Sequence, residues 1–198
     1  MNEEDKRVIR TRAKLTEALI ALSCEQGYDA VTVQEIAERA DINYRTFYRH
    51  YDSKDDLLRD VLQTTMFELR ETMPPPTPEE LSAPDYHKIA RRNTCNLYQY
   101  VADNSDIFRL LLQSGPVALI PIHQFARRET EKFFAGHAVG DVPHDLIANH
   151  MISATFSIMR WWLENDMAYA PEQMAEYSVQ LIMLPIRRLL LGSEEPVS

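Results

Sequence analysis

Glycine and cysteine are scarce in this sequence of 198 residues, which contains five glycines and two cysteines. Few glycines and few segments of alternating hydrophobicity argue against a fold of short strands and tight turns, and predict an all-α protein. Cys24 and Cys95 lie far apart, each within a helical apolar pattern. They therefore indicate buried thiols in a reducing compartment rather than a disulfide framework or a zinc site.

Long hydrophobic runs are absent as well. No stretch approaches the roughly 18 apolar residues that a membrane-spanning helix needs. The charged N-terminus is not followed by the apolar segment of a signal peptide. We therefore expect a cytoplasmic protein with no membrane partner.

Positive charge is also in short supply, because 21 Lys and Arg face 30 Asp and Glu and leave a net charge of −9. That balance argues against charge-driven binding of nucleic acid over the whole surface. Residues 41–58, "DINYRTFYRHYDSKDDLL", nevertheless gather two arginines, a histidine, a lysine and several aromatic residues. Any attraction for DNA must therefore come from one face of this segment.

Helical periodicity dominates the rest of the chain. Apolar spacing predicts helices over 5–26, 32–40, 44–51, 53–73, 85–103, 105–113, 116–136, 143–166 and 171–191. Residues 73–84 hold five prolines in twelve positions, and no helix is expected to run through them. Pro121 is expected to split or kink its helix, and Pro185 to bend the last one.

Several helix ends carry capping signals. Thr32 and Glu35 have the spacing of a capping box, and Ser53 is expected to cap the helix that follows it, with Asp56 at the third position. Asn43 can cap the short helix at 44–51, and Gly27 supplies a C-cap for the first helix. These signals define a module of three helices and the start of a fourth.

Helices 32–40 and 44–51 are joined by only three residues, which is typical of a helix-turn-helix that lays its second helix in the major groove of DNA. At 100° per residue, Phe47 and Tyr51 share one face, which we expect to join the module core. Hydrogen-bond donors lie elsewhere: the opposite face carries Arg45, Thr46 and Arg49, flanked by Tyr48 and His50, with Tyr44 in the first turn. The helix N-terminus is expected to offer free N–H groups to a phosphate.

Residues 10–62 resemble the DNA-binding region of the TetR family of bacterial transcriptional regulators, through "LTEALIALSCEQGYDAVTVQEIAERA" followed by "TFYRHYDSKDDLL". The resemblance implies that Tyr44, Arg45 and Thr46 probe base edges. It also implies that Tyr48, His50 and Lys54 grip phosphates, and that Thr32 caps its helix against the backbone. With Arg49 from the geometry, the predicted DNA-binding residues are Thr32, Tyr44, Arg45, Thr46, Tyr48, Arg49, His50 and Lys54.

Two positions depart from the family pattern. Asp41 replaces the glycine that most relatives have in the turn, and aspartate tolerates the left-handed conformation better than most residues. Arg45 stands where relatives often carry a small residue. A guanidinium there indicates a guanine contact or an additional phosphate contact.

The remaining chain divides into a connecting helix at 53–72, after the helix-turn-helix domain at 5–52, and a helical ligand-sensing and dimerisation domain at 85–192. Helix 143–166 has two apolar stripes, one of which is Ile147, Met151, Ala154, Ile158 and Trp161. Both stripes could be buried within one chain, or one could meet a second copy. The family resemblance favours the second alternative, with the last two long helices forming a four-helix dimer interface.

"WWLENDMAYAPEQMAEY" and "NSDIFRLLLQSG" resemble the C-terminal domain of a TetR subgroup that includes coactivators of dihydroxyacetone kinase, which work through a protein partner. Many TetR-type regulators bind a small-molecule effector in this domain. Here the aromatic and methionine residues at helical spacing could line such a cavity or simply form core, the candidates being Tyr98, Phe108, Leu111, Phe125, Phe156, Met159 and Trp162.

No catalytic, metal-binding or cofactor-binding pattern is found in the sequence. We therefore expect no enzyme, no metal and no cofactor. The expected function is that of a homodimeric repressor that binds a near-palindromic DNA operator and is released by a small molecule. The alternative is a TetR-like coactivator that works through a protein partner.

Overall fold

The computed structural model describes residues 3–72, 77–134 and 142–191, and within these ranges it contains helices and no strand. The chain folds into two compact units. The first comprises Met1–Phe67 with Asn104–Pro121, and the second comprises Glu68–Asp103 with Ile122–Ser198. The predicted all-α class is confirmed.

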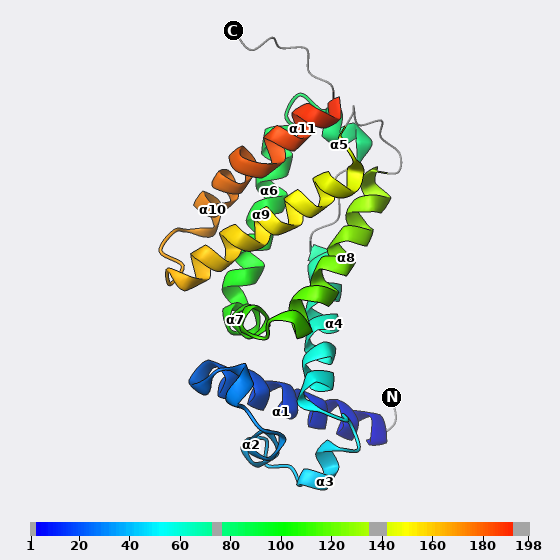
Figure 1. The fold of residues 1–198 in the computed structure, drawn as a ribbon, viewed down its shortest axis with the longest axis vertical. Coiled ribbons are helices and arrows are strands. Elements are labelled where there is room, and N and C mark those ends of the chain that lie inside the picture. Colours follow the sequence, from blue (N-terminus) through cyan, green and yellow to red (C-terminus); the bar gives the residue numbers. More distant parts are fainter. Residues whose placement is uncertain (1–2, 73–76, 135–141, 192–198) are drawn as a thin grey trace. The chain divides into compact units, whose positions relative to one another are not determined.

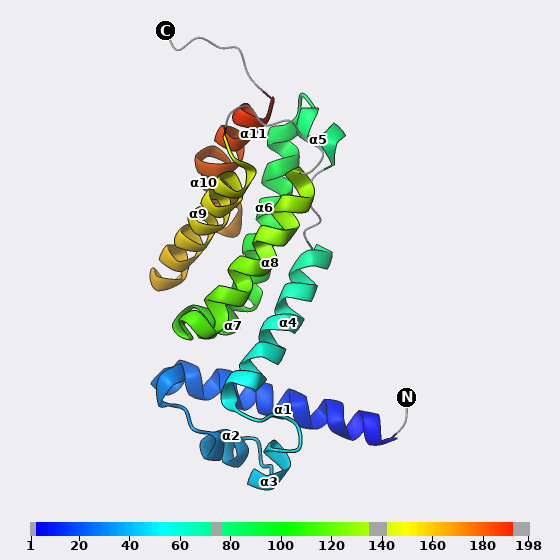
Figure 2. The same ribbon diagram turned by 45° about the vertical axis from the view of Figure 1, so that its right-hand side comes forward.

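The first unit is built around the N-terminal helices. It contains α1 (Glu3–Gln26), the 3-10 turn η1 (Tyr28–Ala30), α2 (Val33–Arg39), α3 (Tyr44–Phe47), most of α4 (Lys54–Thr72) and α7 (Ser105–Gln113). Figures 1 and 2 both show α2 and α3 on the same side of α1. The core expected from the apolar spacing is buried, as seen at Leu15, Leu19, Ile36, Phe47, Leu57 and Leu58.

Helix α7 lies in a different unit from the one expected. The sequence division assigned residues 105–113 to the C-terminal domain, whereas α7 packs against α1. Its apolar side chains, Phe108 and Leu111 among them, are buried. Periodicity shows that a helix has an apolar face to bury, but it does not identify the helix that will cover that face. The apolar face of α7 is covered by α1, which ends about 80 residues earlier in the sequence.

The second unit contains the remaining helices. These are the end of α4, α5 (Pro78–Ser82), α6 (Tyr86–Asp103), most of α8 (Pro116–Phe134), α9 (His144–Glu164), α10 (Pro171–Ser178), the π-helical turn η2 (Val179–Met183) and α11 (Leu184–Leu191). Helix α10 runs beside α6 (Figure 1), and the buried Tyr98 hydroxyl of α6 lies 2.7 Å from the Ser178 hydroxyl of α10. Each hydroxyl thereby satisfies a polar group that burial removes from water.

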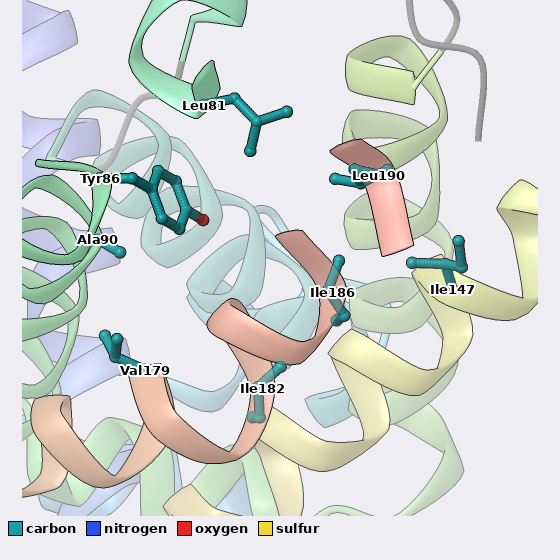
Figure 3. Packing of buried hydrophobic residues seen from close by; sticks show 8 residues of the cluster. All are labelled: Leu81, Tyr86, Ala90, Ile147, Val179, Ile182, Ile186 and Leu190. Carbon is teal, nitrogen blue, oxygen red and sulfur yellow. The ribbon is translucent and has the colours of Figure 1, made fainter. Parts of the chain in front are cut away.

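One hydrophobic cluster joins five elements of the second unit. Figure 3 shows its side chains converging from α5, α6, α9, η2 and α11. Its members are Leu81, Tyr86, Ala90, Ile147, Val179, Ile182, Ile186 and Leu190. Arg187 joins α11 to the C-terminal end of α5, because its guanidinium donates to the carbonyl oxygens of Leu81 at 2.9 Å and Ala83 at 3.0 Å.

This cluster bears on the α9 stripe of Ile147, Met151, Ala154, Ile158 and Trp161, one of the two stripes that could have met a second copy. Ile147 belongs to the cluster, and Met151, Ala154 and Ile158 pack against it, so most of that stripe is used within the chain. Its last member, Trp161, is 47% exposed. The exposed side of α9 is instead lined by Leu146, His150, Ser153, Ser157 and Trp161.

Proline-containing segments also differ from expectation. Residues 78–82 form the short helix α5, because Thr77 and Glu80 make a capping box and Pro78 occupies the first turn, where a missing N–H costs nothing. Helix α8 continues through Pro121. Before Pro185, where a bend was expected, the helix contains a π-helical turn. This turn accommodates the backbone hydrogen bond that proline cannot donate.

No helix in the described part of the chain combines the length and the hydrophobicity that crossing a membrane requires.

Candidate nucleic-acid interface

The turn between α2 and α3 is held by backbone and side-chain hydrogen bonds. Asp41 adopts a φ of 53°, in the left-handed region, as its position in the turn predicts. Ile42 N–H then donates to the Ala37 carbonyl at 2.9 Å, and the Asn43 side chain accepts from Arg45 N–H at 2.9 Å. The predicted Asn43 cap is therefore confirmed, and the turn fixes where α3 begins.

Helix α3 is shorter than the sequence predicts. It ends at Phe47, and the chain continues to Tyr51 as turns, in which His50 and Tyr51 N–H both donate to the Phe47 carbonyl. The inward face is as expected, since Phe47 is fully buried and Tyr51 is 7% exposed. Most of the expected N–H donors at the helix start are engaged, because Arg45 N–H donates to the Asn43 side chain and Thr46 and Phe47 N–H donate to the Asn43 carbonyl. Side chains therefore provide most of the donors that this segment can offer.

Four side chains of this segment reach solvent: Tyr44, Arg45, Tyr48 and Arg49 are exposed, while Thr46 and His50 are partly buried. Tyr44 and Tyr48 form a pair, with ring centroids 5.0 Å apart and hydroxyl oxygens 3.1 Å apart. The hydrogen bond with Tyr44 raises the pKa of Tyr48, and the pair uses one of its two hydroxyl protons, so one hydroxyl can donate outward. The structure thus brings together six of the eight predicted residues.

Aromatic contacts connect this outer surface to the core. The Phe47 ring lies 5.4 Å from that of Tyr48 and 5.9 Å from that of Tyr51. The Tyr51 hydroxyl donates to Asp60 on α4, and burial together with this bond raises the pKa of Tyr51. Because the inner rings are fixed, the outer side chains have a rigid base.

His50 lies at the edge of this base, with its ring centroid 6.5 Å from that of Tyr51. Burial lowers the pKa of His50, and the positive charges of Arg12 and Arg49 lower it further. Arg12 was not among the predicted residues. It lies on α1, and its guanidinium carbon is 5.7 Å from the centre of the Tyr51 ring. Sequence spacing within the helix-turn-helix gives no signal for Arg12, which lies about twenty positions before the start of α2.

Thr32 and Lys54 occupy different surroundings from the other six. Thr32 forms the predicted capping box, in which Glu35 N–H donates to its hydroxyl and its own N–H donates to the Glu35 carboxylate at 2.8 Å. The Lys54 ammonium donates to the carbonyl oxygens of Tyr28 and Val31 at 2.8 Å and of Asp29 at 3.2 Å. It also lies 4.5 Å from the centre of the Tyr28 ring. All three ammonium protons therefore have a partner within the module.

Other cations of the first unit are also engaged. Arg39 makes a bidentate ion pair with Glu25, at 2.6 and 2.8 Å, and Arg59 pairs with Asp56. Arg45 and Arg49, by contrast, have no ion pair with any described residue. Two uncompensated guanidinium groups beside paired phenols form a surface suited to phosphates and base edges.

A short helix with an anchored inner face and an outer face of donors, joined to α2 by a tight turn, defines a helix-turn-helix DNA-binding protein. Comparison with known proteins agrees. Residues 15–61 match the N-terminal domain described as bacterial regulatory proteins of the TetR family, and residues 91–184 match a transcriptional regulator C-terminal region. The chain belongs to the TetR family. Its members are DNA-binding transcriptional regulators and not enzymes.

A similar curated protein is an HTH-type transcriptional regulator, YxbF, of Bacillus subtilis. It is 26% identical over 182 residues, which cover 90% of this chain and 46% of that protein. Over a shorter stretch of 52 residues, TcmR of Streptomyces glaucescens is 38% identical, covering 26% of this chain and 23% of that regulator. The chain thus spans less than half the length of the curated relatives that it matches.

Solved structures share the fold. A TetR transcriptional regulator from Streptococcus agalactiae has a TM-score of 0.68 at 21% identity, covering 90% of this chain and 97% of that one. NalD, a repressor of a multidrug efflux pump in Pseudomonas aeruginosa, has a TM-score of 0.67 at 16% identity, covering 92% and 97%. DhaS, a dihydroxyacetone kinase operon activator, has a TM-score of 0.55 at 15% identity, covering 91% and 98%.

Proposed function

We propose that this protein is a cytoplasmic transcriptional repressor that binds a near-palindromic operator as a homodimer and is released by a small-molecule effector. The observation that carries the DNA-binding part is the outer face of residues 44–50, where two arginines without ion-pair partners in the described chain flank the Tyr44–Tyr48 pair. Such a face can contact phosphates and read base edges in one groove.

Direct DNA contacts are assigned to the six clustered residues. Arg45 and Thr46 follow the helix start and are proposed to reach base edges, while Arg49 and His50 lie further along and are proposed to bind phosphates. Tyr44 and Tyr48 can do either through the one hydroxyl proton that their mutual hydrogen bond leaves available.

Thr32 and Lys54 are proposed to act indirectly. Each already satisfies groups of the module itself, at the junction of η1, α2 and α4. We infer that Thr32 and Lys54 hold the start of α2, and that a direct phosphate contact through Lys54 would require it to give up a carbonyl partner.

The homodimer is proposed to form through the exposed sides of α9 and of the α10–α11 segment. Leu181 is 65% exposed and Trp161 is 47% exposed, and such large apolar side chains favour a protein partner over water. Ser153 and Ser157 on the exposed side of α9 are small enough for a second helix to approach closely. A second copy is the fitting occupant, because two recognition helices about 34–36 Å apart read successive major grooves of a palindrome.

Release from the operator is proposed to be thermodynamically linked to binding of the effector. A ligand of the second unit that binds more tightly to a conformation unable to reach both half-sites would shift the population away from the operator. The buried Tyr98 and Trp162 rings, 5.3 Å apart on α6 and α9, are among the side chains that such a ligand would have to part. Of the other five candidates, Phe108 and Leu111 lie in the first unit and are set aside, while Phe125, Phe156 and Met159 lie in the second.

A coactivator that works through a protein partner is the second candidate. It is favoured by the similarity to DhaS and by a group of exposed aromatic side chains on the second unit. In this group the ring centroid of Tyr169 lies 5.8 Å from that of Trp161, on which it stacks, and 5.8 Å from that of Tyr177. Such a protein could keep DNA binding as well.

Selection of binding sites from fragmented genomic DNA with the purified protein tests the proposal. We expect a near-palindromic sequence to be enriched, and a metabolite panel added afterwards to contain a compound that reduces its retention. If no duplex is retained above bulk competitor DNA at moderate ionic strength, the regulator is not acting through DNA, and the protein-partner alternative takes its place.

A further inference from the structure

Arg12 is the one cation of α1 that has a described contact with the end of the helix-turn-helix segment. Its guanidinium carbon lies 5.7 Å from the centre of the Tyr51 ring, and its side chain is exposed. No carboxylate of the described residues pairs with it. An arginine stacked on an aromatic ring keeps the edge of its guanidinium free, and that edge carries all the N–H donors.

The ring beneath Arg12 is fixed. Tyr51 is 7% exposed and its hydroxyl is bonded to Asp60, so the ring cannot turn away. Stacking therefore restricts the guanidinium before any ligand arrives. Less conformational entropy is lost when a pre-ordered side chain binds, which strengthens the contact.

Tyr51, the ring beneath Arg12, also neighbours His50, with ring centroids 6.5 Å apart. Burial lowers the pKa of His50, and the positive charges of Arg12 and Arg49 both lower it further. Positive charge thus acts on this side chain from two elements, α1 and the segment after α3. Guanidinium groups without a paired carboxylate favour an anion beside them.

We infer that Arg12 binds a DNA backbone phosphate and extends the DNA-binding surface from the helix-turn-helix onto α1. This inference rests on the proposed DNA-binding function and adds a contact that spacing within the motif does not predict. The guanidinium fork matches two phosphate oxygens, so the contact positions the module on the duplex without reading a base.

Salt dependence of binding to a random-sequence duplex of about 30 base pairs tests the inference without knowledge of the operator. Neutralising one phosphate contributes about 0.9 to the slope of log K against log salt. We expect Arg12→Gln to lower the slope by about 0.9 per bound protomer and to weaken binding about eightfold per protomer near 0.1 M salt. Arg12→Lys keeps the charge and should restore most of the slope.

Lys14→Gln provides the matched control, because it removes one exposed cation of the same helix at a position about 200° around its axis. Folding of each variant is checked by thermal melting, and NMR titration of His50 should show a higher pKa in Arg12→Gln, as expected when a nearby positive charge is removed. The inference is overturned if Arg12→Gln and Lys14→Gln change the slope equally, or if Arg12→Lys behaves like the glutamine variant. If the unaltered protein itself does not bind the duplex, the proposed function fails instead.

Discussion

Replacing Lys54 with methionine separates the two roles that this residue could have. Methionine keeps most of the apolar stem and removes only the ammonium group, which donates to three carbonyl oxygens between 2.8 and 3.2 Å away. Those carbonyls belong to residues 28, 29 and 31, at the junction of α1 and α2. The substitution therefore leaves three acceptors without their shared donor.

The size of the effect follows from these bonds. A hydrogen bond from a charged donor contributes about 1.5–3 kcal/mol, but contributions are not additive, and water can replace part of the loss at a partly exposed site. Loss of the cation over the Tyr28 ring adds about 0.5–1 kcal/mol. We expect Lys54→Met to lower the free energy of unfolding of the first unit by about 2–3 kcal/mol in total.

Hydrogen exchange of the backbone amides of residues 28–40 is the suitable assay. Both tryptophans lie in α9, so tryptophan fluorescence reports on the second unit and not on the first. Lys14→Met, which removes an exposed cation of α1, should change protection by less than about 0.5 kcal/mol. If Lys54→Met leaves protection unchanged and instead flattens the salt dependence of DNA binding by about 0.9 per protomer, Lys54 grips a phosphate and the structural role is wrong.

Three further changes test the DNA face, the dimer and proton linkage. Arg45→Ala should cost about 1–3 kcal/mol at the selected operator and alter base preference, whereas equal losses on operator and random DNA would assign Arg45 to a phosphate. Leu181→Glu should yield monomers in sedimentation at low micromolar concentration. Phe67→Glu is the control, because Phe67 on α4 is also 65% exposed, and this variant should remain dimeric. If Leu181→Glu remains dimeric, the dimer does not form through the surface around Leu181. Burial and the guanidinium groups of Arg12 and Arg49 lower the pKa of His50 in the free protein, and a DNA phosphate beside it would raise that pKa again. DNA binding should therefore take up a proton, and it should strengthen as pH falls from about 7.5 to about 6. His50→Gln should remove that increase, and an unaltered pH profile would place His50 away from phosphates.

Local signals in the sequence predicted the helix-turn-helix closely. The capping box at Thr32, the cap at Asn43 and the cap at Ser53 all form as expected, and Asp41 takes up the left-handed turn. Each of these features depends on residues no more than three positions apart. Local chemistry decides them, and the sequence displays that chemistry directly.

Contacts between distant residues were harder to predict. From the sequence, the Lys54 side chain could point outward to DNA or inward to η1. The position of Tyr28 in the folded protein favours the inward direction, because the ammonium group lies over the Tyr28 ring. Likewise α9 has two apolar stripes, and the stripe that begins at Ile147 packs largely on the chain's own core rather than being left for a second copy. Periodicity identifies faces to be buried, but the partner of each face depends on packing that no short window of sequence contains.

The acidic composition becomes compatible with DNA binding once the carboxylates near the recognition segment are considered. On α4, Asp55 accepts from the Tyr28 hydroxyl, Asp60 accepts from the Tyr51 hydroxyl, and Asp56 pairs with Arg59. These three carboxylates are held by partners within the module, so part of the negative charge of α4 is compensated locally. Acidic groups elsewhere repel the duplex. Attraction is therefore expected where the unpaired guanidinium groups of Arg45 and Arg49 project, and a docking orientation that presents this face to DNA is favoured.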